Sequence, residues 1–85
     1  MADKETLLNL LRASAPSGRE TAAASVFRSA VEGFADEVET DHVGTVTARV
    51  KGSAGRTLVV MGHIDEIGVI VSHIDDKGFL RFQQV

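Results

Sequence analysis

The sequence of 85 residues contains no cysteine, which excludes disulfide bonds, thiolate metal ligands and cysteine nucleophiles together. It also lacks a basic stripe. With 9 basic and 12 acidic side chains the formal net charge is −3, so nucleic acid is not an expected partner. There is no long apolar run at the charged N-terminus or elsewhere, and the longest, Leu58 to Met61, is far too short to cross a bilayer. We therefore expect a cytoplasmic protein with no membrane partner.

The composition allows only a small folded unit. Apolar residues make up 44% of the chain and charged residues 25%, which is typical of a globular protein. A chain of this length buries roughly 60–65% of its unfolded surface, so its stability on its own is expected to be marginal. The chain also stops at Val85 inside a strand-like run, which favours a fragment of a longer protein.

The first segment with helical periodicity lies near the start of the chain. The leucines between Leu7 and Leu11 fall at helical spacing, and Asp3 is a suitable N-cap residue. Proline disfavours the helical conformation of the residue before it, so Pro16 should end this helix at or before Ala15.

A second helix is predicted more strongly. Ser17 followed three residues later by Glu20 matches a capping box, with Ser17 as the N-cap. Gly33 stands where a helix commonly ends. Between these signals, apolar residues recur at steps of three and four and form one continuous stripe that needs a covering partner: Ala23, Val26, Phe27, Ala30, Val31 and Phe34.

From Val38 onward the apolar period changes to two, which predicts strands. Residues 46–50 alternate apolar and polar side chains, as in a strand with one buried face. Leu58 to Met61 is apolar on both faces, as expected for a strand inside a covered sheet. Val69 to Ile74 and Phe79 to Val85 are predicted to form a hairpin, because a turn-forming Asp-Asp-Lys-Gly sequence joins them.

The sharpest chemical feature is His63-Ile64-Asp65, which directly follows the apolar strand. Residues two apart in an extended chain point to the same side, so His63 and Asp65 are expected to project together. A neutral imidazole binds zinc well, and a carboxylate that accepts its other ring N–H fixes the tautomer. The spacing alone is weak evidence for a metal site, because a strand-end histidine hydrogen-bonded to a loop aspartate gives the same pattern.

Neighbouring titratable residues are weaker candidates. Alternation along an extended chain directs Glu66 away from His63, which favours a loop-anchoring role over a catalytic base. His42 lies in a predicted turn and is expected to be solvated. His73 and Asp75 repeat the two-residue spacing, but no buried strand leads them into a cleft, so a surface pair is expected.

Longer stretches around these residues resemble a known family. They are Met-Gly-His-Ile-Asp-Glu-Ile-Gly at 61–68, Val-Ile-Val-Ser-His-Ile-Asp at 69–75, Gly-Phe-Leu-Arg-Phe at 78–82, Ala-Pro-Ser-Gly-Arg-Glu at 15–20 and Asp-His-Val-Gly at 41–44. In this order and spacing they resemble the tetrahedral aminopeptidases, whose relatives include the glutamyl and deblocking aminopeptidases. The resemblance covers nearly the whole chain.

The resemblance implies a fold and an assembly. The expected fold is α/β, with two N-terminal helices packed on a mixed β-sheet as in the N-terminal part of a zinc-exopeptidase catalytic domain. Residues 1–68 would belong to this catalytic domain, and residues 69–85 would begin a β-rich inserted dimerisation domain. Members of the family form dodecameric tetrahedral particles, so the resemblance also implies self-association.

The resemblance also implies a chemistry. The expected activity is that of a metallo-aminopeptidase, which removes N-terminal residues from peptide substrates with water activated by two zinc or cobalt ions. His63 would be a ligand of one ion, and Asp65 would be the catalytic-site residue that orients it. The bridging aspartate, the catalytic glutamate and the other ligands lie beyond residue 85 in such enzymes, so these 85 residues alone are expected to be inactive.

Two other interpretations remain open at this point. The chain could be a non-catalytic folded or assembly module, because it carries few ligands. It could also belong to a related dinuclear zinc deacylase or exopeptidase, because those enzymes share the His-x-Asp motif. One departure from the family pattern, Thr45 in place of the usual asparagine, is expected to alter a turn and leave the chemistry unchanged.

Overall fold

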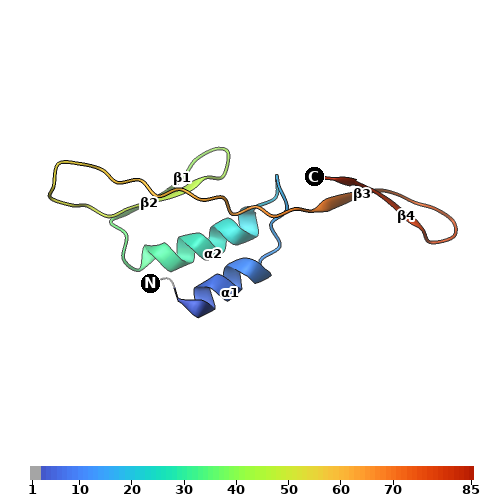
Figure 1. The fold of residues 1–85 in the computed structure, drawn as a ribbon, viewed down its shortest axis with the longest axis horizontal. Helices are drawn as coiled ribbons and strands as arrows, with labels where there is room; N and C mark the ends of the chain where they lie inside the picture. Colours follow the sequence, from blue (N-terminus) through green and yellow to red (C-terminus); the bar gives the residue numbers. More distant parts are fainter. Residues whose placement is uncertain (1–2) are drawn as a thin grey trace.

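The computed structural model describes residues 3–85, in which two helices are followed by two separate β-hairpins (Figure 1). The predicted α/β class and the predicted order of elements are confirmed, except that the apolar segment at 58–61 forms no strand. The elements are α1 (Lys4–Arg12), α2 (Thr21–Glu32), β1 (Glu37–Thr40), β2 (Val46–Arg49), β3 (Val69–Ile74) and β4 (Leu80–Gln84). The longest helix has 12 residues, and no helix in the described part of the chain is long and apolar enough to cross a membrane.

Helix α1 begins and ends as its sequence predicts. The backbone N–H of Thr6 donates to the carboxylate of Asp3 at 2.9 Å, which makes Asp3 the N-cap. The helix ends at Arg12, and Ala13 has already left the helical conformation. The extended chain that follows leads into Pro16, consistent with the restriction that proline places on its predecessor.

The predicted capping box of α2 is wrong. The N-cap is Glu20, and no side chain caps this end of the helix. Gly18 has a φ of +88°, so the chain turns sharply there and leaves Ser17 outside the helix. The carboxylate of Glu20 accepts the backbone N–H of Gly18 at 2.5 Å, while the hydroxyl of Ser17 donates to a distant residue. The predicted C-terminal end at Gly33 is confirmed.

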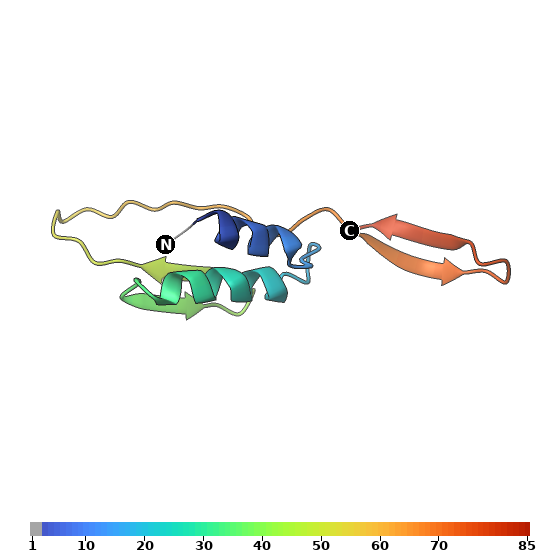
Figure 2. The same ribbon diagram turned by 90° about the horizontal axis from the view of Figure 1, so that it is seen from below.

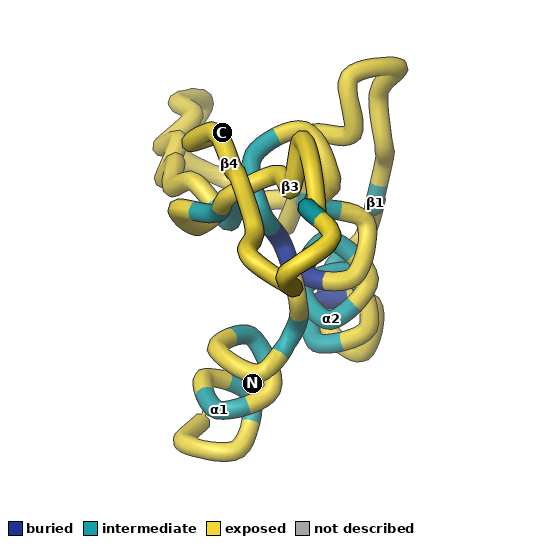
Figure 3. The backbone as a smooth tube through the Cα atoms, turned by 90° about the vertical axis from the view of Figure 1, so that its right-hand side faces the viewer, coloured by how far each residue is buried: buried dark blue, intermediate teal, exposed yellow. Residues whose placement is uncertain are grey.

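The packed part of the molecule is a narrow stack. Helix α2 lies against the β1–β2 hairpin, and α1 lies against α2 on the side away from the strands (Figures 1 and 2). The buried residues among 3–85 are Ala15, in the loop before α2, and Ala23 and Val31 of α2, and the tube in Figure 3 is dark blue near α2. The core of the described residues is therefore smaller than that of a compact chain of this length.

The two hairpins close with the same turn chemistry. In the first, the carboxylate of Asp41 accepts the backbone N–H groups of Val43 and Thr45 at 3.0 and 2.9 Å. In the second, Asp75 accepts those of Lys77 and Phe79, both at 2.9 Å. In each turn the fourth residue is a glycine with positive φ. Thr45 takes part in its turn through its backbone N–H, as Phe79 does in the second turn.

The predicted single mixed sheet is not formed by the described residues. They form two separate antiparallel two-stranded sheets instead, β1–β2 and β3–β4. The segment Leu58 to Met61, predicted as a strand in a covered sheet, pairs with neither and is highly exposed, with Leu58 at 90%. Its apolar side chains suit a covered strand, but residues 3–85 contain nothing that covers it.

The absence of a covered sheet gives the chain an elongated shape. Its extents are 64 × 26 × 16 Å, and its radius of gyration is 17.3 Å, whereas a compact chain of this length would have about 12 Å. The β3–β4 hairpin projects away from the helices (Figure 2). Both of its strands carry exposed apolar side chains.

Candidate functional site

The histidine and aspartate predicted to act together do meet. Nδ1 of His63 lies 2.9 Å from Oδ1 of Asp65 and 3.1 Å from the backbone oxygen of the same residue. Both partners are acceptors when the carboxylate is ionised, so we assign the imidazole proton to Nδ1. In the neutral ring Nε2 then carries the free lone pair, and the His63 side chain is 87% exposed. This is the arrangement in which histidine binds a metal through Nε2.

A serine completes this hydrogen-bond chain from the other side. Oγ of Ser17 donates to Oδ2 of Asp65 at 2.5 Å, so both carboxylate oxygens have a partner. Two hydrogen bonds lower the pKa of Asp65 below its ordinary value of 3.8, and the one from Ser17 has a larger effect than the one from His63. The carboxylate is therefore ionised at neutral pH and can orient the imidazole.

The two loops that carry these residues are joined by backbone contacts. The N–H of Glu66 donates to the carbonyl of Ala15 at 2.8 Å, and Pro16 forms a parallel bridge with Glu66. A Cβ added to Gly68 would lie 2.8 Å from Cβ of Pro16, so only glycine allows this close approach. The loop before α2 is thereby fixed to the segment that carries the candidate ligand.

Glu66 lies where the sequence predicts. Its carboxylate accepts the backbone N–H of Ala15 at a long 3.4 Å, so the side chain faces the neighbouring loop. None of the hydrogen bonds of the described residues joins Glu66 to His63. The anchoring role predicted for Glu66 therefore matches its contacts.

The other histidines are not drawn into this site. His73 stands opposite Arg81 in the β3–β4 hairpin, and the carboxylate of Asp75 caps the turn. His42 is exposed in the turn between β1 and β2. Within residues 3–85 no three histidine, aspartate, glutamate or cysteine side chains converge to hold a metal ion. The chain thus offers one supported imidazole, which suits one ligand of a metal ion and does not make a complete site.

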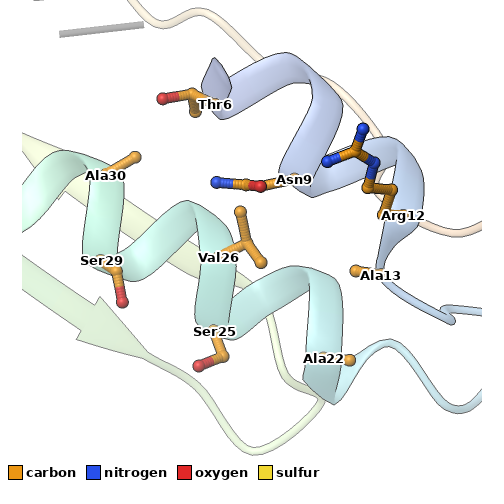
Figure 4. A pocket seen from close by; sticks show the side chains of 9 residues that line it. All are labelled: Thr6, Asn9, Arg12, Ala13, Ala22, Ser25, Val26, Ser29 and Ala30. Carbon is orange, nitrogen blue, oxygen red and sulfur yellow. The ribbon is translucent and has the colours of Figure 1, made fainter.

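A groove lies elsewhere in the described part of the chain, between α1 and α2. Figure 4 shows Asn9 extending from α1 toward Val26 and Ala30 of α2. The other lining residues are Thr6, Arg12, Ala13, Ala22, Ser25 and Ser29. Arg12 is the one charged residue among them, and His63 and Asp65 do not line the groove. We therefore place the candidate chemistry at the loop contact and not in this groove.

Sequence reasoning missed Ser17 as part of the site. Its position three residues before Glu20 imitates a capping box, and its true partner is 48 residues away in the chain. The one available signal was that the loop at 15–20, like the His-x-Asp motif, is part of the resemblance to the family.

The sequence is similar to those of known aminopeptidases. The family of M42 glutamyl aminopeptidases matches residues 44–85. FrvX of Escherichia coli (strain K12) is 41% identical over 81 residues, which cover 95% of this chain and 22% of FrvX. The lysyl aminopeptidase of Pyrococcus furiosus is 37% identical over 82 residues, which cover 95% of this chain and 23% of that enzyme.

A solved structure is similar over the same span. The TET aminopeptidase of the marine sediment archaeon Thaumarchaeota archaeon SCGC AB-539-E09 superposes with a TM-score of 0.84 at 38% identity. The match covers 94% of this chain and 23% of that one. The chain therefore spans less than a quarter of the length of the relatives that it matches.

Proposed function

We propose, on the premise that this chain belongs to the M42 glutamyl aminopeptidase family, that it is part of a metal-dependent aminopeptidase. The observation that carries the proposal is the pairing of His63 with Asp65 at 2.9 Å, which leaves Nε2 free on an exposed ring. A histidine held in this way is ready to bind a divalent cation without a change of tautomer.

The chemistry we propose is the hydrolysis of the first peptide bond of a peptide substrate. Two zinc or cobalt ions, when bound, would activate a water molecule and polarise the scissile carbonyl. His63 would supply one imidazole nitrogen to one of these ions. Asp65 would not touch the substrate; it would keep the proton on Nδ1 and the ring in a fixed orientation.

We also propose that residues 1–85 alone do not catalyse this reaction. A pair of ions about 3.5–4 Å apart needs several ligands, and the described residues bring no three candidate ligands together. The remaining ligands and the general base would come from other parts of a longer polypeptide. Two observations support this view. The core of residues 3–85 is small, and nothing in these residues covers the apolar segment Leu58 to Met61.

The domain boundaries, the assembly and the cellular location that we propose follow the resemblance to the family. Residues 1–68 would belong to the catalytic domain, and the β3–β4 hairpin within residues 69–85 would begin an inserted dimerisation domain. The apolar side chains on that projecting hairpin suit contact with further protein. We expect assembly into tetrahedral dodecamers and a cytoplasmic location, the latter in keeping with a sequence free of cysteine.

A test of this function uses the full-length polypeptide that contains these residues. Peptides with a free amino terminus should be shortened by one residue at a time, and N-acetylated copies of the same peptides should not. His63→Ala should reduce the rate by at least about 100-fold through loss of the ion. The matched control His73→Ala, which changes an exposed histidine outside the site, should leave the rate unchanged.

Other outcomes would favour the alternatives. Release of acetate from the acetylated peptides would indicate a dinuclear deacylase that shares the His-x-Asp motif. A full-length protein that binds no zinc and cleaves neither peptide would indicate a non-catalytic module. Full peptidase activity in His63→Ala would contradict the role proposed for the histidine.

A further inference from the structure

We propose that Ser17 is a positioning residue of the metal centre, which acts on the ion through Asp65 and His63. The inference deepens the proposed function and depends on it. Two hydrogen bonds carry it: Oγ of Ser17 lies 2.5 Å from Oδ2 of Asp65, and Oδ1 of Asp65 lies 2.9 Å from Nδ1 of His63. Ser17 is thus two hydrogen bonds away from the ring whose Nε2 would bind the metal.

The hydroxyl fixes a carboxylate that would otherwise be free to turn. The side chain of Asp65 is 36% exposed, so without Ser17 water would compete for Oδ2. The carboxyl group would then rotate about its bond to Cβ, and Oδ1 would leave the line of Nδ1. With one oxygen held by a neutral donor, the other stays directed at His63, and the ring keeps one orientation.

The backbone holds Ser17 in place for this task. Its neighbour Pro16 lies against Gly68, and Ala15 accepts the N–H of Glu66. The next residue, Gly18, turns the chain with a φ of +88°, so Ser17 faces the other loop instead of capping α2. Helix α2 therefore starts without a side-chain cap, and the hydroxyl of Ser17 donates a hydrogen bond to Asp65, 48 residues away in the sequence.

A metal titration of the full-length polypeptide tests the inference. The metal-free protein is titrated with Zn²⁺ by calorimetry, and peptidase activity is followed against free Zn²⁺. Loss of a hydrogen-bond partner behind a ligating histidine typically weakens metal binding about 10- to 100-fold. Ser17 is one hydrogen bond further from the metal than Asp65, so its loss should have an effect at the lower end of this range. Ser17→Ala should therefore need about 10-fold more Zn²⁺ for half-maximal activity. At saturating Zn²⁺ the KM for the peptide should be that of the unchanged protein.

Conservative variants separate positioning from simple loop stability. Ser17→Thr keeps the hydroxyl and should keep the Zn²⁺ requirement of the unchanged protein. Ser17→Cys keeps nearly the same volume but has only a weak donor, so it should resemble Ser17→Ala. If Ser17→Ala fails to fold, this pair decides the matter alone. Ser14→Ala, in the same loop but without a side-chain hydrogen bond in the described structure, is the matched control and should have no effect.

The outcomes distinguish this inference from the function on which it rests. If His63→Ala abolishes activity while Ser17→Ala and Ser17→Cys keep the Zn²⁺ requirement unchanged, the inference is overturned and the proposed function stands. A lower melting temperature in the Ser17 variants without a shifted Zn²⁺ requirement would overturn it equally. If His63→Ala binds Zn²⁺ and cleaves peptides normally, both fail.

Discussion

The ring of Pro16 lies against the backbone of Gly68, so closely that a Cβ at position 68 would sit 2.8 Å from Cβ of the proline. Two loops that are 52 positions apart in the sequence are held together at this point. The contact brings Ser17 to Asp65 and so supports the candidate site.

The first prediction follows from this contact. Gly68→Ala should lower the free energy of unfolding of the full-length polypeptide by about 1–3 kcal/mol, because the added methyl group overpacks the site and must push the loops apart. Denaturant unfolding measures this change. Gly52→Ala is the control, since a Cβ there meets nothing within 4 Å, and it should be neutral or slightly stabilising. Equal stability of the two variants would contradict the close approach.

The second prediction concerns the shared turn chemistry of the hairpins. Asp75→Ala removes the acceptor for the N–H groups of Lys77 and Phe79, so it should destabilise the β3–β4 hairpin by about 1–2 kcal/mol. Faster amide exchange in that hairpin would report the loss. The neighbouring Asp76→Ala removes no hydrogen bond seen in the structure and should leave exchange unchanged. Similar exchange in both variants would mean that Asp75 does not hold the turn.

The third prediction is a dependence of helix α1 on pH. The hydrogen bond from the backbone N–H of Thr6 lowers the pKa of Asp3 below 3.8 in the folded chain. Because the folded pKa is the lower one, the stabilisation is fully present above pH 3.8 and is lost as the pH falls through the folded value. The amide resonance of Thr6 should follow this titration. In Asp3→Asn, which keeps an acceptor without a charge, the resonance should no longer titrate with this group; a persistent transition would assign it elsewhere.

The fourth prediction concerns the exposed segment at 58–61. In the 85-residue chain, Leu58 and Val60 are 90% and 89% exposed, and exposed apolar patches promote association. The double variant Leu58→Lys, Val60→Lys should therefore lower the apparent mass of this short chain in light scattering. The control Thr57→Lys adds a charge without removing an apolar side chain and should change the mass little. The same mass in all three chains would show that this segment does not drive association.

Local features of the fold could be read from the sequence, whereas features that depend on distant residues could not. The cap at Asp3, the end of α2 at Gly33 and the bounds of β3 each follow from a few neighbouring residues, and all three agree with the structure. Ser17 could not be assigned, because its hydroxyl can cap a helix or bond a distant carboxylate with equal chemistry. The structure decides for the second.

The strand predicted at 58–61 failed for a related reason. Apolar side chains on both faces indicate that a segment needs to be covered on both sides, and residues 3–85 do not cover this one. The pairing of His63 with Asp65, in contrast, depends on a spacing of two residues and is present as predicted. Its use as a metal ligand stays a prediction, because residues 3–85 bring no three candidate ligands together.

The central claim, that His63 binds a divalent ion, is tested most directly by counting bound metal. The full-length polypeptide, stripped with a chelator and reloaded with Zn²⁺, should hold two ions per chain. His63→Ala should hold at most one at the same free Zn²⁺ concentration, and His73→Ala should still hold two. Two ions retained in His63→Ala, with unchanged affinity, would contradict the claim.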